Sequence, residues 1–138
     1  MNVQLLDFDC SEDAEGVVCW DALAQPQPRY NSALLQEVAK VLAWAHAFDA
    51  SGPGPLEDGA SWDFDLQVRL LHDGLPMQSA QILFVPLADK RNQQPSGDPS
   101  PHLRLDPAPG PQQRIELSLS LSGTPGFAEA FRAQFDLP

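Results

Sequence analysis

Residues 62–70 read Trp-Asp-Phe-Asp-Leu-Gln-Val-Arg-Leu, and this stretch decides the fold class. Large apolar side chains alternate with polar ones without a break, which is typical of a strand with one buried and one wet face. We therefore predict a strand over residues 61–73. The apolar side is Trp62, Phe64, Leu66, Val68 and Leu70, and the polar side is Asp63, Asp65, Gln67 and Arg69.

The chain after this strand contains further strand patterns. Asp73 and Gly74 form a turn signal, and the apolar run from Ala80 to Leu87 predicts the next strand. Arg114 to Ser122 alternates Ile or Leu with Glu or Ser, which predicts a second half-buried strand.

The segment between these strands, residues 88–113, is rich in proline, glycine, serine and glutamine. A packed core cannot be built from such residues, so we predict a long mobile or extended loop. Within it, only residues 102–105 are expected to pair briefly as a strand.

The N-terminal part of the chain predicts a β-hairpin, because two apolar-rich runs, residues 3–10 and 17–24, flank a polar stretch. The favoured register pairs Phe8 with Trp20 and buries a continuous apolar face. In the alternative register the two cysteines lie directly opposite each other, but the apolar face is lost.

Residues 32–50 predict a helix, because apolar side chains recur there at spacings of three and four. Asn31 or Ser32 is expected to cap its N-terminus, and the segment that begins at Ser51 ends it with two glycines and two prolines. The apolar stripe consists of Leu34, Val38, Val41, Ala45 and Phe48.

A second helix is predicted to begin at Thr124 and Pro125, residue types suited to the cap and the first helical position. Phe127, Phe131 and Phe135 then share one face at four-residue spacing. Such a stripe usually docks a helix onto a sheet, and an alternative hypothesis uses it as the interface of a homodimer.

These elements follow the order ββαβββα within a single domain, residues 1–138. Runs of neighbouring strands favour an antiparallel sheet over a parallel one. The predicted fold is α+β, with an antiparallel sheet of about five strands and two helices packed on one face.

Charge excludes whole classes of partner. Nineteen acidic residues against eight basic ones give a net charge of −11, which disfavours nucleic acids and anionic membranes. No apolar run of membrane-spanning length and no basic leader are present, so we expect a cytoplasmic protein with Cys10 and Cys19 reduced.

The tripeptide Asp-Phe-Asp occurs twice, at residues 7–9 and 63–65. In a strand, Asp7 and Asp9 leave one face together, as do Asp63 and Asp65. If the two strands were neighbours, four carboxylates would converge as ligands for Ca²⁺ or Mg²⁺. The alternative interpretation is that these acids mark the wet side of each strand.

Patterns that carry catalysis are missing from the sequence. It lacks paired histidines or cysteines at zinc-ligand spacing, a Gly-x-Ser-x-Gly elbow and a glycine-rich phosphate loop. We therefore expect neither an enzyme nor a cofactor or a bound metal.

The leading hypothesis is a small acidic protein-binding module whose four aspartates meet a basic partner protein. Its size and acidity are similar to those of small acidic chaperones and immunity proteins, a similarity of bulk properties. The alternative is a small-ligand or divalent-metal-binding domain with a pocket between the sheet and the first helix. Trp20, Trp44 and Trp62 would line that pocket.

Overall fold

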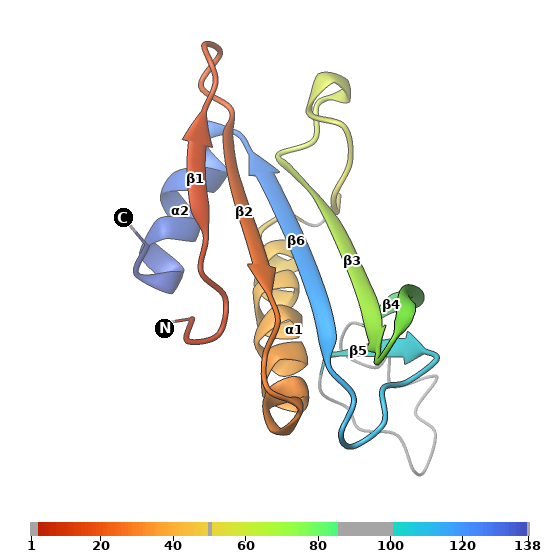
Figure 1. Cartoon of the computed structure of the whole chain (residues 1–138). Helices are drawn as coiled ribbons and strands as arrows, with labels where there is room; N and C mark the ends of the chain where they lie inside the picture. Colours follow the sequence, from red (N-terminus) through yellow and green to blue (C-terminus); the bar gives the residue numbers. More distant parts are fainter. Residues whose placement is uncertain (1–2, 50, 86–100, 138) are drawn as a thin grey trace, which may run out of the picture.

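The computed structural model describes residues 3–49, 51–85 and 101–137, which form a six-stranded antiparallel sheet and two helices (Figure 1). The strands are β1 (Asp9–Glu12), β2 (Val18–Ala24), β3 (Trp62–His72), β4 (Leu75–Val85), β5 (His102–Asp106) and β6 (Ile115–Gly123). The helices are α1 (Asn31–Phe48) and α2 (Pro125–Phe135). The α+β class is confirmed. The sheet has six strands instead of about five, and the order is ββαββββα.

The strands lie in the order β1-β2-β6-β3-β4-β5, so the last strand in sequence fills the middle of the sheet. Along β6 every second residue is buried, from Ile115 to Gly123, and the residues between them are half-buried. This matches the predicted alternation. One face of the sheet therefore carries the core, and the opposite face carries serine and glutamate.

Both helices cover the same face of the sheet, behind it in Figure 1. Trp44 of α1 lies 5.6, 5.8 and 5.7 Å, between ring centroids, from Phe127, Phe131 and Phe135 of α2. These phenylalanines are 0%, 0% and 2% exposed. They belong to the core, and the exposed stripe that a symmetric contact through α2 would need is not present.

The two halves of β4 pair with different strands. Residues 75–80 pair with β3, and residues 81–85 pair with β5. The far end of the sheet thereby approaches α1, where His46 lies 4.9 Å from Phe84 and 5.1 Å from Trp62 between ring centroids. β4 begins five residues before the predicted start at Ala80, and the predicted end falls outside the described residues.

The predicted pairing of residues 102–105 is confirmed, because β5 pairs with β4 over its whole length. The rest of the predicted loop divides into two parts. Residues 88–100 lie outside the described residues, and residues 107–113 connect β5 to β6 without a helix or strand.

The hairpin differs from both predicted registers. Cys10, and not Phe8, pairs with Trp20, and Asp9 pairs with Asp21. The first strand is therefore shifted along the second relative to the favoured pairing. The turn determines this register. The Asp13 carboxylate accepts hydrogen bonds from the backbone N–H groups of Glu15 and Val17, at 2.8 and 2.9 Å, and so holds a tight loop.

The first strand also begins later than predicted, at Asp9 instead of Val3. The preceding residues are held by α1, because the Glu37 carboxylate accepts hydrogen bonds from the backbone N–H groups of Gln4, Leu5 and Leu6. Successive N–H groups that converge on one anion form a nest, a conformation that strand pairing does not allow.

The ends of the helices give one wrong and one confirmed prediction. Tyr30 occupies the cap position of α1 without a side-chain hydrogen bond, and Asn31 instead donates from its amide to the Gln113 carbonyl at 2.9 Å. On α2 the Thr124 hydroxyl accepts a hydrogen bond from the Phe127 N–H, as predicted.

Candidate functional site

The face of the sheet opposite the helices is here called the outer face. Strand alternation brings there side chains of three neighbouring strands which, apart from the exposed Leu23, are polar. They are Cys19, Asp21 and Leu23 of β2, Glu116, Ser118, Ser120 and Ser122 of β6, and Asp63, Asp65, Gln67 and Arg69 of β3.

Three of the outer-face carboxylates lie in one row across four strands. The registers align Asp9, Asp21, Ser120 and Asp65 on β1, β2, β6 and β3 in turn. The Ser120 hydroxyl donates to the Asp21 carboxylate at 2.6 Å. Adjacent strands are about 4.8 Å apart, so this row places negative charges at intervals along the sheet surface.

The next row continues the negative charge toward the hairpin tip. It aligns Ser11, Cys19, Ser122 and Asp63 on the same four strands. A shallow cavity of about 400 Å³ lies over the two rows. An adjoining cavity of about 650 Å³ shares Cys19, Asp63 and Ser122 with the first, so the two form one depression.

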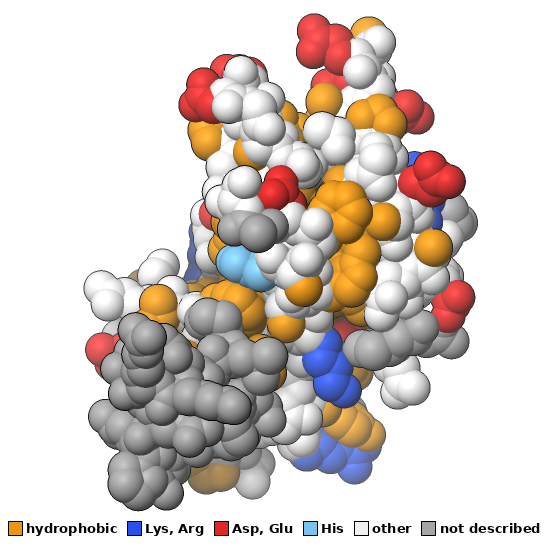
Figure 2. All heavy atoms as spheres, turned by 180° about the vertical axis from the view of Figure 1, so that it is seen from behind, with side chains coloured by type: hydrophobic (Ala, Val, Ile, Leu, Met, Phe, Trp, Pro, Cys, Tyr) orange, Lys and Arg blue, Asp and Glu red, His pale blue; other side chains and the backbone are white. Residues whose placement is uncertain are grey.

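We call this depression the acidic groove. Its acidic residues come from the sheet, the hairpin tip and the turn before β3, and none of the described residues that line either cavity is a lysine or arginine. Figure 2 shows acidic side chains on the two projections at the top of the molecule, which Figure 1 identifies as the hairpin and the segment before β3. The acids of the groove are Asp13, Glu15, Asp21, Glu57, Asp63 and Asp65.

The sequence-predicted aspartates divide into two groups. Asp9, Asp63 and Asp65 belong to the outer face, whereas Asp7 precedes β1 and is exposed outside the sheet. The two Asp-Phe-Asp segments are not neighbours, because β2 and β6 separate β1 from β3. Their four carboxylates therefore do not converge.

Asp21 is the residue that sequence reasoning missed. It lies between the two segments and connects them across the face. The signal was present in β2, where Val18, Trp20 and Ala22 are buried and Asp21 takes the opposite parity.

Metal binding finds no geometric support among residues 3–49, 51–85 and 101–137. Within these ranges no three histidine, cysteine, aspartate or glutamate side chains are grouped so that they could hold a metal ion. The carboxylates of the outer face are spread along rows and do not form a cage.

The two cysteines lie on opposite faces of the hairpin. Cys10 is opposite Trp20, which faces the core, and Cys19 is opposite Ser11 on the outer face, so they cannot form a disulfide with each other. Burial raises the pKa of the Cys19 thiol, and the nearby Asp21 and Asp13 carboxylates and Cys10 raise it further. The thiolate that nucleophilic chemistry requires is therefore disfavoured.

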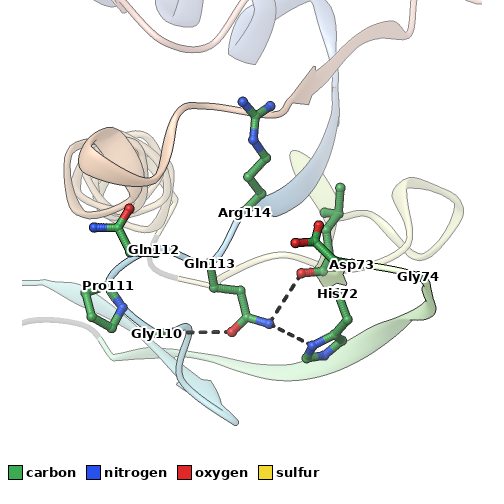
Figure 3. Close-up of a pocket in the computed structure, with 9 residues that line it drawn as sticks. His72, Asp73, Gly74, Gly110, Pro111, Gln112, Gln113 and Arg114 are labelled. Atoms are coloured by element: carbon green, nitrogen blue, oxygen red, sulfur yellow. Dashed lines mark hydrogen bonds between the residues drawn. The ribbon is translucent and has the colours of Figure 1, made fainter.

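A second cavity, of about 770 Å³, lies where the β3–β4 turn meets the segment before β6 (Figure 3). The Gln113 amide nitrogen lies 3.2 Å from His72 Nδ1 and donates to the Leu71 carbonyl at 3.5 Å, while its oxygen accepts from the Gly110 N–H. His72 Nε2 lies 3.1 Å from the Gln78 side-chain oxygen. Through these contacts Gln113 fastens the segment before β6 to the β3–β4 turn.

The tryptophans do not line the pocket that the ligand-binding alternative places between sheet and helix. Trp20 and Trp62 are 1% and 0% exposed, and Trp44 packs on the rings of α2. Trp20 and Trp62 belong to the core, and Trp44 is partly buried against it.

Comparison with known proteins returns no matching family model, no matching curated protein and no matching solved structure. In the described part of the chain, neither helix has the length and apolarity needed to cross a membrane.

Proposed function

We propose that this protein is a non-catalytic protein-binding module whose acidic groove binds a basic protein. The observation that carries the proposal is the set of six carboxylates that line the groove from the hairpin tip across the outer face, with no lysine or arginine among the described residues of its lining. The helices cover the other face of the sheet, so this surface is open to a partner. The raised pKa of Cys19 supports a binding role over a nucleophilic one.

Electrostatics define how such a partner would bind. A surface with one sign of charge accelerates encounter with the opposite sign, and the Debye length of about 8 Å at physiological salt limits its reach. Binding should therefore be fast and strongly weakened by salt. A cytoplasmic location, in which both cysteines remain reduced, is part of the proposal.

A charge-matched pair of variants tests the proposal. The groove variant combines Asp21→Asn, Asp63→Asn and Asp65→Asn. The control variant combines three exposed acids from elsewhere and has the same net charge. These are Asp73→Asn, Asp106→Asn and Glu129→Gln.

Both variants and the wild-type chain are titrated with a fluorescent lysine-rich peptide at 50 mM and 500 mM salt. We expect the groove variant to lose at least tenfold in affinity at low salt and the control less than twofold. Equal losses in the two variants would show that net charge alone acts, and the groove would then have no role. Capture from lysate at low and high salt identifies the natural partner.

A further inference from the structure

β1 forms one edge of the sheet, and among the described residues no strand pairs with its outer side. All four of its residues, Asp9–Glu12, are exposed. In Figure 1 it lies at the margin of the sheet, beside β2 alone. Such an edge is a template for an additional strand, unless its side chains prevent pairing.

The hydrogen-bond pattern shows which backbone groups of β1 are available. The Asp13 N–H donates to the Val17 carbonyl at 2.9 Å, which continues the pairing of β1 with β2 into the turn. In an antiparallel pair, hydrogen-bonded and non-hydrogen-bonded pairs alternate. Ser11 and Asp9 therefore direct their N–H and C=O groups to β2, and Cys10 and Glu12 direct theirs outward.

Charge selects the occupant of this edge. If β1 paired with a second copy of itself so that the outward groups of Cys10 met those of Glu12 in the other copy, Asp9 of each copy would lie opposite Asp13 of the other. Like charges directly opposite each other destabilise a strand pair, so self-association is disfavoured. A basic strand meets the opposite condition, because its cations would lie beside those carboxylates.

The two faces of β1 impose different requirements on an added strand. On the outer face, its side chains would extend the row of Asp9, Asp21 and Asp65. On the helix side they would lie beside Cys10, where the Arg132 guanidinium is 3.7 Å from the sulfur. Glu12 shares that side with Cys10, but the Arg132 guanidinium opposes a cation there, so a cation is favoured on the outer face and an uncharged side chain on the helix side.

We propose that β1 accepts an extended segment of the basic partner as a seventh strand, with lysine or arginine at alternate positions and uncharged residues between them. This inference rests on the proposed function and specifies the partner's form. The groove attracts the partner by charge, and the edge determines its conformation through the free backbone groups of Cys10 and Glu12.

The test uses the wild-type chain and three synthetic peptides with alternating lysine and valine. One peptide is unmodified. The other two are N-methylated on alternate amides, one in each phase, so that together they block both edges of the peptide strand. Affinity is measured by fluorescence titration, and hydrogen exchange of the Cys10 and Glu12 amides is followed by NMR.

We expect the unmodified peptide to slow exchange at both amides at least tenfold, and only one of the two methylated peptides to lose affinity, by tenfold or more. If both methylated peptides bind as well as the unmodified one and exchange stays fast, the edge inference is overturned and the proposed function stands. If no peptide binds at low salt, both fail. Exchange protection that rises with protein concentration alone would show self-pairing and refute the charge argument.

Discussion

Gly123, the last residue of β6, allows a stringent test of the packing. A Cβ atom at this position would lie 2.2 Å from Phe127 Cδ1 and 2.8 Å from its Cγ, whereas carbon atoms in contact prefer about 3.5–4.0 Å. The Phe127 ring cannot move away, because Trp62 stacks on it at 5.8 Å and Phe48 and Trp44 lie 5.4 and 5.6 Å away. Overpacking of this kind costs about 1–3 kcal/mol. We expect Gly123→Ala to lower the free energy of unfolding by about 3 kcal/mol.

The assay is urea denaturation followed by far-UV circular dichroism. Gly126→Ala is the matched control, since nothing lies within 4 Å of its added Cβ and Gly126 is the second residue of α2, so it should raise stability by about 0.5–1 kcal/mol. Phe127→Ala alone should cost about 3–5 kcal/mol. In the double variant, Phe127→Ala removes the two ring atoms closest to the Cβ added by Gly123→Ala. The double variant should therefore lose at least about 1 kcal/mol less than the two single losses added together. A Gly123→Ala protein within about 0.5 kcal/mol of wild type would refute the packing argument.

Three further predictions concern charge. Glu37→Gln should destabilise the protein by about 1–3 kcal/mol and speed hydrogen exchange at residues 4–6, because three backbone N–H groups lose a charged acceptor; unchanged exchange would contradict the clamp. Asp65→Asn should raise the free energy of unfolding by a few tenths of a kcal/mol at low salt, since charges roughly 10 Å apart in water repel by about 0.4 kcal/mol, and the gain should vanish in 1 M salt. In a Cys10→Ser background, the rate of Cys19 alkylation should reach half its maximum at a pH above the pKa of a free cysteine. Asp21→Asn should lower that midpoint pH. Because the unfolded thiol releases its proton first, stability should fall as pH rises above the unfolded pKa; a midpoint insensitive to Asp21→Asn would remove that carboxylate as a cause.

The elements that sequence predicted well are those with a strong hydrophobic period. Alternation from Trp62 to Leu70 and from Ile115 to Leu121 gave β3 and β6, and spacings of three and four gave α1. In each case burial of one face dominates over every local preference, so the pattern alone determines the element.

The hairpin and the start of β4 were mispredicted for two different reasons. Apolar residues near the N-terminus suggested a strand, but the carboxylate of Glu37, distant in sequence, holds their backbone in a different conformation. The start of β4 contains Pro76, and the polar Gln78 and Ser79 follow soon after it, which argues against a strand. The irregularity in its pairing with β3 between Leu70 and His72 accommodates that proline.

The candidate site could be predicted only in part, because strand order is a property of the whole chain. Asp9, Asp63 and Asp65 were found from their parity in single strands. Their relation depends on β6, which separates β3 from the hairpin, and on Asp21, which lies between them. Neither fact is contained in a local pattern.

The central position of β6 also has a consequence for folding kinetics. Asp21 and Ser120, which meet across β2 and β6, are 99 residues apart in sequence, and β2 and β3 have no contact as strands without β6 between them. Closing so long a loop must precede most of the stabilising contacts, which slows folding toward the millisecond-to-second range. Until that step, β2 and β3 each expose an unpaired inner edge beside Trp20 and Trp62, so the interval before β6 docks is the period of greatest risk of aggregation.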